Sequence, residues 1–336
     1  MRRQTDWLLI MLYLSPDNLE RLSLTPQDVL TAVRRGIEAH ANGEGTAEPT
    51  LSFLLPENAP GAIYTVRGTY HPSRIASVKV VGAFPDNRKN RLPPDTGLLT
   101  LFSLDTGEPA AILDASFITR WRTAAAVAIA GIHLGRGDSR VLACIGSRGI
   151  APLAAKLMHD HFGFDEIRFH SRSEDARKQA VASFSNENLT AVDAQSWEDC
   201  ISGADIVIDG AALTAHTPLF PASAVGEGQT IVSYGAYSSL PMDLSDCLDR
   251  AFTDRWVDGD TGLSGSVGPL IAAGRITQDT ITGYLGDSLT GAVPGRTSSG
   301  ERILVWLRGL AECDVTLGQA LVDAASAQGV GTELTY

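Results

Sequence analysis

The sequence lacks the surplus of basic residues that nucleic-acid-binding proteins carry. It has 27 Lys and Arg against 39 Asp and Glu in 336 residues, which gives a formal net charge of −12. Because binding to a phosphate backbone depends on an excess of Lys and Arg, we expect no nucleic-acid partner. An anionic substrate would need a local cluster of arginines.

Cysteine is scarce, and long apolar runs are missing. The four cysteines stand far apart without CxxC or zinc-ligand spacing, which favours free thiols in a reducing compartment. The apolar run 7–14 follows two arginines, as in a signal peptide, but Asp6 interrupts the pattern and no small-residue cleavage site follows. A run of this length cannot span a bilayer, so we expect a cytoplasmic protein with no membrane partner.

His159 and His161 predict no metal site, because residues two apart on a helix do not share a face.

The remaining composition is that of a globular protein of more than one domain. Apolar residues make up 44% and charged residues 20% of the chain, and its length favours two compact units. Up to residue 114, turn signals such as Asp105-Thr106-Gly107 separate short apolar segments, which is typical of an antiparallel sheet. These predicted strands are 8–14, 77–81, 98–104 and 110–113. A helix is expected at 25–41, where Pro26 follows Thr25 in the first turn.

From Arg140 onward, predicted strands and helices alternate. This alternation indicates a doubly wound parallel sheet. The strands are expected at 141–145, 167–170, 190–192, 206–209, 230–234 and 251–253, and the helices at 152–162, 174–184 and 197–202. An alanine-rich helix at 119–134 connects the two zones, and a helical tail that includes 317–327 returns to the first.

A glycine turn after the first of these strands predicts a dinucleotide site. The apolar strand 141–145 runs directly into Gly146-Ser147-Arg148-Gly149-Ile150 and then into a helix. Such a turn directs the free N–H groups of the helix start toward a pyrophosphate. The second glycine of the usual GxGxxA pattern is replaced by Arg148, which is itself a candidate phosphate ligand. The alternative is a helix-start turn that binds nothing.

The next strand ends at Ser171-Arg172-Ser173, where NAD-preferring sites usually place an acid. Here no acid occurs until Glu174. An arginine pairs with a 2′-phosphate that a carboxylate would repel, so NADP(H) is favoured and NAD(H) is the second choice. Alternatively, or in addition, Ser171 caps the next helix and Glu174 closes a capping box.

Five strings give the whole chain a family resemblance in their order and spacing: VKVVGAFPDN at 78–87, LDTGEPAAILDA at 104–115, TRWRTAA at 119–125, GAVPGR at 291–296 and GLAECD at 309–314. The chain resembles the ornithine cyclodeaminase and mu-crystallin family. The opening MLYL at 11–14 and the closing GTELTY at 331–336 are most similar to the branch that makes siderophore precursors by oxidatively splitting an amino acid conjugate.

The resemblance implies an α/β fold in which a Rossmann domain is inserted into an α+β domain for substrate binding and dimerisation. The expected Rossmann domain is 126–309, and the second domain consists of 1–125 plus 310–336. Family members include cyclodeaminases, alanine and arginine dehydrogenases and cyclic ketimine reductases. All of them handle an amino acid carbon that passes between amine and imine, and a homodimer is expected.

The resemblance also implies substrate residues. Lys79 matches the family's active-site lysine, and its apolar strand makes a charged partner necessary, which a substrate carboxylate supplies. It is also a candidate proton donor or acceptor. Arg122 matches the arginine that grips the substrate carboxylate, with Thr123 assisting on the cofactor side. The alternatives are a rim lysine with a solvated head and a surface arginine.

Two departures from the family pattern bear on function. A family arginine expected after Pro49 is replaced by Thr50; Arg67 is a candidate substitute, or an exposed charge at a strand end. Gly235 is expected beside the cofactor, but Tyr237 stands where cyclodeaminases carry an aspartate. A phenol cannot give the same charge pairing to a reacting amine, although it can donate a hydrogen bond to substrate or serve in packing.

Together these features predict an NAD(P)-dependent oxidoreductase acting on a C–N bond of an amino acid, an imine or an amino acid conjugate. Lys79, Arg122 and Tyr237 are the candidate catalytic residues. Two alternatives remain open. One is a redox-neutral cyclodeaminase that releases ammonia, and the other is a non-catalytic, NADPH-dependent binder of a small ligand.

Overall fold

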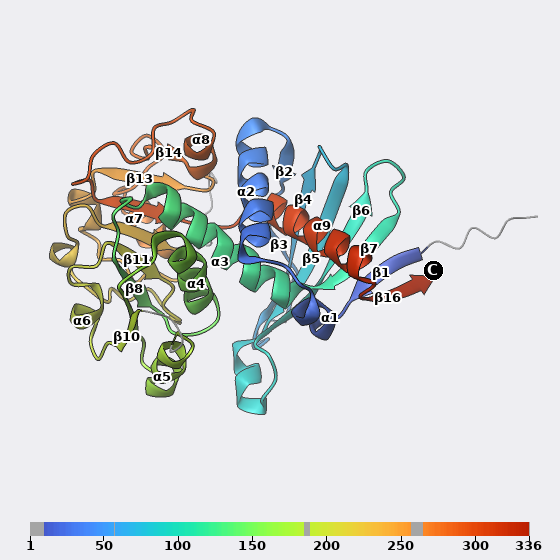
Figure 1. Ribbon diagram of the computed structural model, residues 1–336, viewed down its shortest axis with the longest axis horizontal. Helices are drawn as coiled ribbons and strands as arrows, with labels where there is room; N and C mark the ends of the chain where they lie inside the picture. Colours follow the sequence, from blue (N-terminus) through green and yellow to red (C-terminus); the bar gives the residue numbers. More distant parts are fainter. Residues whose placement is uncertain (1–9, 57, 185–188, 257–264, 336) are drawn as a thin grey trace, which may run out of the picture. The chain divides into compact units, whose positions relative to one another are not determined.

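The computed structural model describes residues 10–56, 58–184, 189–256 and 265–335 (Figure 1). The chain divides into unit 1, made of Met1–Arg122 and Leu310–Tyr336, and unit 2, Thr123–Gly309. Helix α3 (Ala115–Leu134) contains the boundary between the units. No helix of the described residues is long and apolar enough to cross a membrane. All four cysteines are free thiols.

Unit 1 is built on an eight-stranded sheet with the order β16-β1-β7-β6-β5-β4-β2, in which β3 pairs with β4. The strands are β1 (Ile10–Leu14), β2 (Gly45–Ala47), β3 (Leu51–Ser52), β4 (Ala62–Tyr70), β5 (Ile75–Ala83), β6 (Asp95–Ser103), β7 (Pro109–Asp114) and β16 (Thr332–Thr335). The prediction of an antiparallel sheet is wrong for one pair, because β1 and β7 are parallel. The long intervening chain permits that crossover. The first two residues of the strand predicted at 8–14 lie outside the described residues.

The helices of unit 1 are α1 (Pro16–Arg21), α2 (Pro26–Asn42) and α9 (Ala311–Gln328), together with the short η1 (Pro85–Asn90). Thr25 caps α2 in a reciprocal capping box with Asp28, and Gly43 ends it in the left-handed conformation. Helix α9 packs against α2 and against β4, β5 and β6. Gly36 permits the approach of α2 to α9, since an added Cβ would lie 2.8 Å from the Cα of Cys313.

Unit 2 contains an eight-stranded sheet with the order β10-β9-β8-β11-β12-β15-β13-β14, and every pair in it is parallel. The strands are β8 (Val141–Ile145), β9 (Glu166–His170), β10 (Thr190–Asp193), β11 (Ile206–Asp209), β12 (Thr230–Ser233), β13 (Arg250–Thr253), β14 (Gly283–Tyr284) and β15 (Ile303–Trp306). The helices are α4 (Ile150–Phe162), α5 (Glu174–Ala182), α6 (Trp197–Ile201), α7 (Gly268–Ala272) and α8 (Leu285–Leu289), with η2 (Ala222–Ala224), η3 (Leu244–Asp246) and η4 (Gly265–Val267). This is the Rossmann fold that the sequence predicts, with its switch point between β8 and β11.

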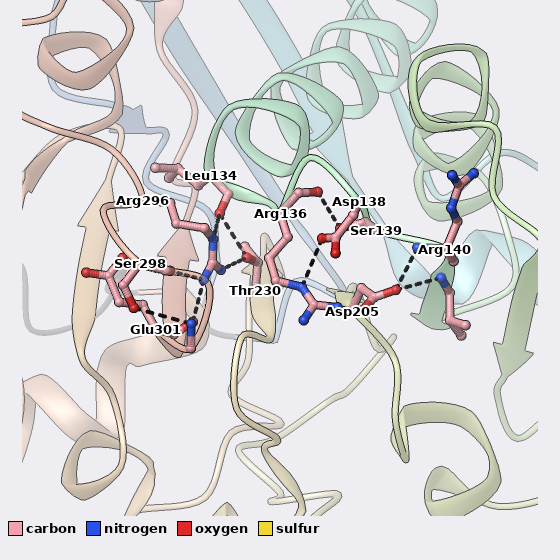
Figure 2. A network of polar contacts seen from close by, with 12 residues as sticks. Leu134, Arg136, Asp138, Ser139, Arg140, Asp205, Thr230, Arg296, Ser298 and Glu301 are labelled. Atoms are coloured by element: carbon pink, nitrogen blue, oxygen red, sulfur yellow. Dashed lines mark hydrogen bonds and ion pairs between the residues drawn. The ribbon is translucent and has the colours of Figure 1, made fainter.

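A polar network holds the end of α3 to the unit 2 sheet (Figure 2). Arg296 donates hydrogen bonds to the carbonyl oxygens of Leu134 at 3.0 Å and Glu301 at 2.7 Å, and to Oγ1 of Thr230 at 2.7 Å. Nearby, Arg136 pairs with Asp205. Leu134 is the last residue of α3, so Arg296 satisfies a carbonyl that the helix itself leaves unpaired. The string GAVPGR therefore has a structural role in this chain.

Candidate functional site

Lys79 lies at the centre of β5 and is almost completely buried. The strand register places it beside Val66 on β4 and Leu99 on β6, and 2% of the residue is exposed. Its Nζ lies 2.7 Å from Oδ2 of Asp314 and donates to Oγ1 of Thr119 at 3.3 Å. The interpretation as a rim lysine is therefore wrong, because its ammonium group lies in the interior of unit 1.

Asp314 supplies the anion that a buried lysine requires. It stands in the first turn of α9 and is 1% exposed. An isolated buried ammonium would be costly, and the short contact with a carboxylate offsets much of that cost. Asp314 was not predicted as a site residue, although it closes the string GLAECD. The signal that could have found it was the need of Lys79 for a partner.

Arg122 completes a cluster of two cations and one carboxylate. Its Nε lies 3.4 Å from Oδ1 of Asp314, and its side chain is 16% exposed. Both Nε and that oxygen are buried without a hydrogen bond among the described residues. Two positive charges against one negative charge leave room for one further anion. A carboxylate pairing with the guanidinium fork would balance the cluster.

The surroundings of Lys79 favour its neutral form more than water does. Burial lowers the pKa of Lys79 to about 8; the charge of Asp314 opposes this and that of Arg122 adds to it. Tyr64 lies on the same face of the sheet, two positions from Val66 along β4, and burial raises the pKa of its phenol. A lysine that titrates near neutral pH can both give and take a proton during turnover.

Arg67 does not join this cluster. Side chains alternate between the two faces of a strand, and Arg67 pairs with Val78, whereas its neighbour Val66 pairs with Lys79. The guanidinium therefore lies on the face opposite Lys79, where it donates to the carbonyl oxygen of Pro49 at 3.4 Å. Arg67, the candidate substitute for the missing family arginine, therefore does not lie beside Lys79, and its role in substrate binding stays a prediction.

The glycine turn after β8 has the backbone that a dinucleotide site needs. Gly146 has a φ of +128°, and an added Cβ would lie 2.8 Å from the carbonyl oxygen of Gly210, so only glycine fits. Gly149 (φ +62°) is the N-cap of α4 and supplies no side-chain cap, which leaves the N–H of Ile150 directed out of the helix start. The hydroxyl of Ser147 is buried without a partner among the described residues. These groups fit a pyrophosphate.

Two exposed arginines lie near the end of β9. Nη2 of Arg148 donates to Oγ of Ser173 at 3.2 Å, and Nη2 of Arg172 donates to the carbonyl oxygen of Ala212 at 2.9 Å. The N-cap of α5 is Ser173, which accepts from the N–H of Ala176, so the expectation that Ser171 caps this helix is wrong. Because Ser173 is the N-cap, the hydroxyl of Ser171 takes no part in capping α5.

Arg177, which was not predicted as a site residue, stabilises the ends of β9 and β10 from the interior of unit 2. It is 7% exposed, donates to the carbonyl oxygen of Ser171 at 2.6 Å and pairs with Asp193. The buried guanidinium therefore holds the end of β9 to the end of β10. Its position inside the predicted helix 174–184 gave no sign of this function.

The remaining predicted residues lie in unit 2. Thr123 follows Arg122 in α3 and is 9% exposed. Gly235 lies just past the end of β12, and Tyr237, two residues further, is 40% exposed. The ring of Tyr237 stands edge-on to that of His216, with 5.5 Å between the centroids.

Comparison with known proteins identifies the family. A model described as the ornithine cyclodeaminase/mu-crystallin family matches residues 17–329. The chain belongs to this family. The match includes Lys79, Arg122 and Asp314 and the whole Rossmann unit, so the predicted membership is confirmed.

Three relatives of the ornithine cyclodeaminase/mu-crystallin family match nearly their full length. The nodulation efficiency protein NfeD of Rhizobium meliloti is 27% identical over 96% of this chain and 98% of its own. The Delta(1)-pyrroline-2-carboxylate reductase of Bacillus cereus is 26% identical over 88% of this chain and 91% of its own. The N-((2S)-2-amino-2-carboxyethyl)-L-glutamate dehydrogenase of Staphylococcus aureus is 23% identical over 96% and 98%.

Two solved structures share the fold over almost the entire chain. The Delta(1)-pyrroline-2-carboxylate reductase of Thermococcus litoralis, in complex with NADH and L-proline, has a TM-score of 0.88 and 25% identity, covering 96% of this chain and 99% of its own. An archaeal alanine dehydrogenase dimer with bound NAD has a TM-score of 0.87 and 23% identity, covering 98% and 100%. The predicted α/β fold with a Rossmann domain and a parallel sheet is therefore confirmed.

Proposed function

We propose that this protein is an NAD(P)-dependent oxidoreductase that acts on the C–N bond of a small amino acid or of the corresponding imine. The observation that carries the proposal is the buried cluster of Lys79, Asp314 and Arg122, with its excess of one positive charge. The named chemistry of the relatives, reduction of a cyclic imine and dehydrogenation of an amino acid conjugate, supports it.

Each residue of the cluster has a distinct task in this proposal. Arg122 binds the substrate carboxylate through its guanidinium fork, and this contact orients the α carbon. Lys79 gives a proton to the substrate nitrogen during reduction and takes one from it during oxidation. Asp314 holds the ammonium group in place. A nicotinamide nucleotide, when bound, would supply or accept the hydride at the α carbon.

The nucleotide we propose is NADP(H), with NAD(H) as a weaker alternative. Gly146, Ser147, Arg148, Gly149 and Ile150 would hold the pyrophosphate. Ser171, Arg172 and Ser173 would face the adenosine ribose, and Gly235 would border the nicotinamide half. The two solved relatives contain NAD or NADH, so the preference for a 2′-phosphate rests on this chain's own arginines. Thr123, which follows Arg122 in α3, would also contact the nucleotide.

We also propose a homodimer that forms through the outer face of the unit 1 sheet. Val80 and Leu98 pair across β5 and β6 on the face opposite Lys79 and remain 37% and 50% exposed. Adjacent exposed apolar residues of this kind suit a self-complementary interface. The solved alanine dehydrogenase relative is described as a dimer, which supports a dimeric assembly but names no interface. Light scattering should give about twice 35.6 kDa, and a monomer would contradict the proposal.

The function is tested by screening purified protein at 340 nm with NADH or NADPH. The substrates are pyruvate or glyoxylate with amines, and cyclic ketimines. We expect turnover of at least one imine. Lys79→Met should abolish it while nucleotide binding persists. Because Lys79→Met leaves Arg122 as the ion-pair partner of the buried Asp314, the double variant with Asp314→Asn shows whether the loss comes from Lys79 or from a disturbed Asp314. Nucleotide binding with no turnover of any substrate would favour the non-catalytic alternative.

A further inference from the structure

The ends of β9 and β10 lie side by side in the unit 2 sheet. The two strands are parallel, and Asp193, the last residue of β10, pairs with Phe169 near the end of β9. The carboxyl ends of parallel strands meet at one edge of the sheet, which is the edge where a dinucleotide binds. Asp193 is therefore a carboxylate one strand away from the expected position of the adenosine ribose.

A carboxylate in this position has different effects on the two nucleotides. An acid near the ribose can accept the hydroxyl groups of NAD(H), whereas it repels the 2′-phosphate of NADP(H). The side chain of Asp193 is 24% exposed, so burial alone does not shield its charge. A site for NADP(H) therefore requires a cation that compensates Asp193.

Arg177 supplies this cation from the interior of unit 2. It is 7% exposed, pairs with the carboxylate of Asp193 and donates from Nη2 to Oε1 of Gln195 at 3.2 Å. Its Nη1 donates to the carbonyl oxygen of Ser171 at 2.6 Å. One guanidinium group thus compensates the carboxylate on β10 and holds the backbone that follows β9.

Arg148 and Arg172 differ from Arg177 in their partners. Arg148 donates to the hydroxyl of Ser173, and Arg172 donates to the carbonyl oxygen of Ala212. Both of these partners are uncharged, and both arginines are exposed. Their charges are available to an anionic group of the nucleotide, whereas the charge of Arg177 is directed at Asp193.

The acids in the first turn of α5 are less able to influence the ribose. Glu174 and Asp175 are exposed, and Glu174 lies 2.5 Å from Nζ of Lys178 in a pair whose side chains are each 64% exposed. Water and salt screen such charges. Asp193 is therefore the carboxylate whose compensation matters most for a 2′-phosphate.

We propose that Arg177 determines the preference for NADP(H) by compensating the charge of Asp193. It is a positioning residue, because it acts through Asp193 and through the backbone of Ser171. Without it, Asp193 takes the part of the acid in an NAD site, and the preference moves toward NADH. The inference rests on the proposed function, which includes a nucleotide site on unit 2.

Fluorescence titration of NADPH and NADH on the intact protein tests this inference without any substrate. Wild-type protein should bind NADPH at least about tenfold more tightly than NADH, as charged contacts to the 2′-phosphate would provide. Arg177→Met should raise the dissociation constant for NADPH at least about tenfold and leave that for NADH within about threefold, because a free carboxylate repels only the phosphate. Arg177→Gln should behave in the same way, since it keeps a donor for the carbonyl oxygen of Ser171 but loses the charge.

The double variant of Arg177→Met with Asp193→Asn separates the effect of charge from that of a damaged fold. It removes the carboxylate as well, so the dissociation constant for NADPH should return to within about threefold of the wild-type value. A structural contact that was simply lost would not be restored by this second change. Arg177→Lys, which keeps the positive charge, should retain the preference for NADPH.

Arg168→Met is the matched control, because Arg168 is another largely buried arginine of the same sheet. Its side chain is 18% exposed, pairs with Glu166 at the start of β9 and donates to the carbonyl oxygen of Ser202 at 2.6 Å. Thermal unfolding of each variant measures any general loss of stability. Arg168→Met should leave the ratio of the two dissociation constants unchanged.

Three results would overturn the inference: equal changes for NADPH and NADH in the Arg177 variants, no recovery in the double variant, or the same shift of the ratio in Arg168→Met. A wild-type protein without a preference for NADPH would overturn it too, although turnover of imines would then still support the redox function. If the preference shifts as expected but no imine is turned over, the redox function fails and the role of Arg177 stands.

Discussion

Lys79 is a cation in a strand of valines, and its neighbours determine when it holds a proton. Burial brings its pKa to about 8, and the carboxylate of Asp314 keeps it from falling further. In the reductive direction the protonated lysine is the donor. The value of kcat/KM should therefore be constant well below pH 8 and fall as the pH rises through the pKa.

Removal of the carboxylate should shift this profile in a defined direction. With Asp314→Asn, burial and the charge of Arg122 are opposed only by the weaker influence of Cys313, so the falling limb should move at least about one unit toward acid. Asp323→Asn is the matched control, because Asp323 is exposed on the same helix. A profile for Asp314→Asn that overlays the wild type would show that this carboxylate does not set the protonation of Lys79.

The arginines at the end of β9 predict a difference between the two nucleotides. Loss of a charged contact to a 2′-phosphate in Arg172→Ala should raise the dissociation constant for NADPH at least about tenfold, and that for NADH by less than about threefold. Fluorescence titration of the nucleotide measures both. Lys178→Ala, which removes an exposed cation of α5, is the control. An equal effect on NADPH and NADH would argue against a 2′-phosphate site.

Elements whose apolar residues recur at regular helical spacing could be predicted from the sequence. Elements that mix polar and apolar residues, or that are very short, could not. Helix α2 has a capping box, a proline and one apolar stripe, and its predicted limits differ from the observed ones by one residue. Strand β4 mixes Thr, Arg and Gly with apolar residues and was missed. Strand β15 was also missed, and it separates β12 from β13 in the sheet. Its four residues lie between loops with no helix directly before them.

The end of α3 depends on Arg296, which suggests a test of stability. Arg296→Ala removes donors to the carbonyl of Leu134, the carbonyl of Glu301 and the hydroxyl of Thr230. We expect the free energy of unfolding to fall by about 2–3 kcal/mol, since several charged hydrogen bonds are lost together. Thermal unfolding followed by circular dichroism measures the change.

Arg275→Ala provides the comparison for this loss, because Arg275 forms an exposed ion pair with Asp246. Such pairs contribute at most about 1 kcal/mol. The melting temperature of Arg296→Lys should lie between those of the two alanine variants, because lysine keeps the positive charge but lacks the several N–H donors of the guanidinium group. Equal melting temperatures for the two alanine variants would refute a special role for Arg296.

On the scale of the whole molecule, the sequence predicted the Rossmann unit better than the charge cluster. The glycine turn is local, so residues 146–150 could be assigned from neighbours along the chain. The contact between Lys79 and Asp314 joins the first and the last parts of the sequence, and no spacing rule connects them. Family resemblance identified Lys79 and Arg122, whereas the carboxylate between them emerged only from the fold.

A net redox reaction at a C–N bond is the proposed activity, and its most direct test is the balance between nucleotide and ammonia. Wild-type protein is given a cyclic ketimine with NADPH, and separately ornithine with NADP⁺ or NAD⁺. Absorbance at 340 nm and ammonia are measured in each. We predict one NADPH oxidised for each amine formed, and no ammonia released from ornithine. Ammonia release from ornithine with no net change at 340 nm, together with no reduction of the ketimine, would contradict the claim and assign the protein to cyclodeamination.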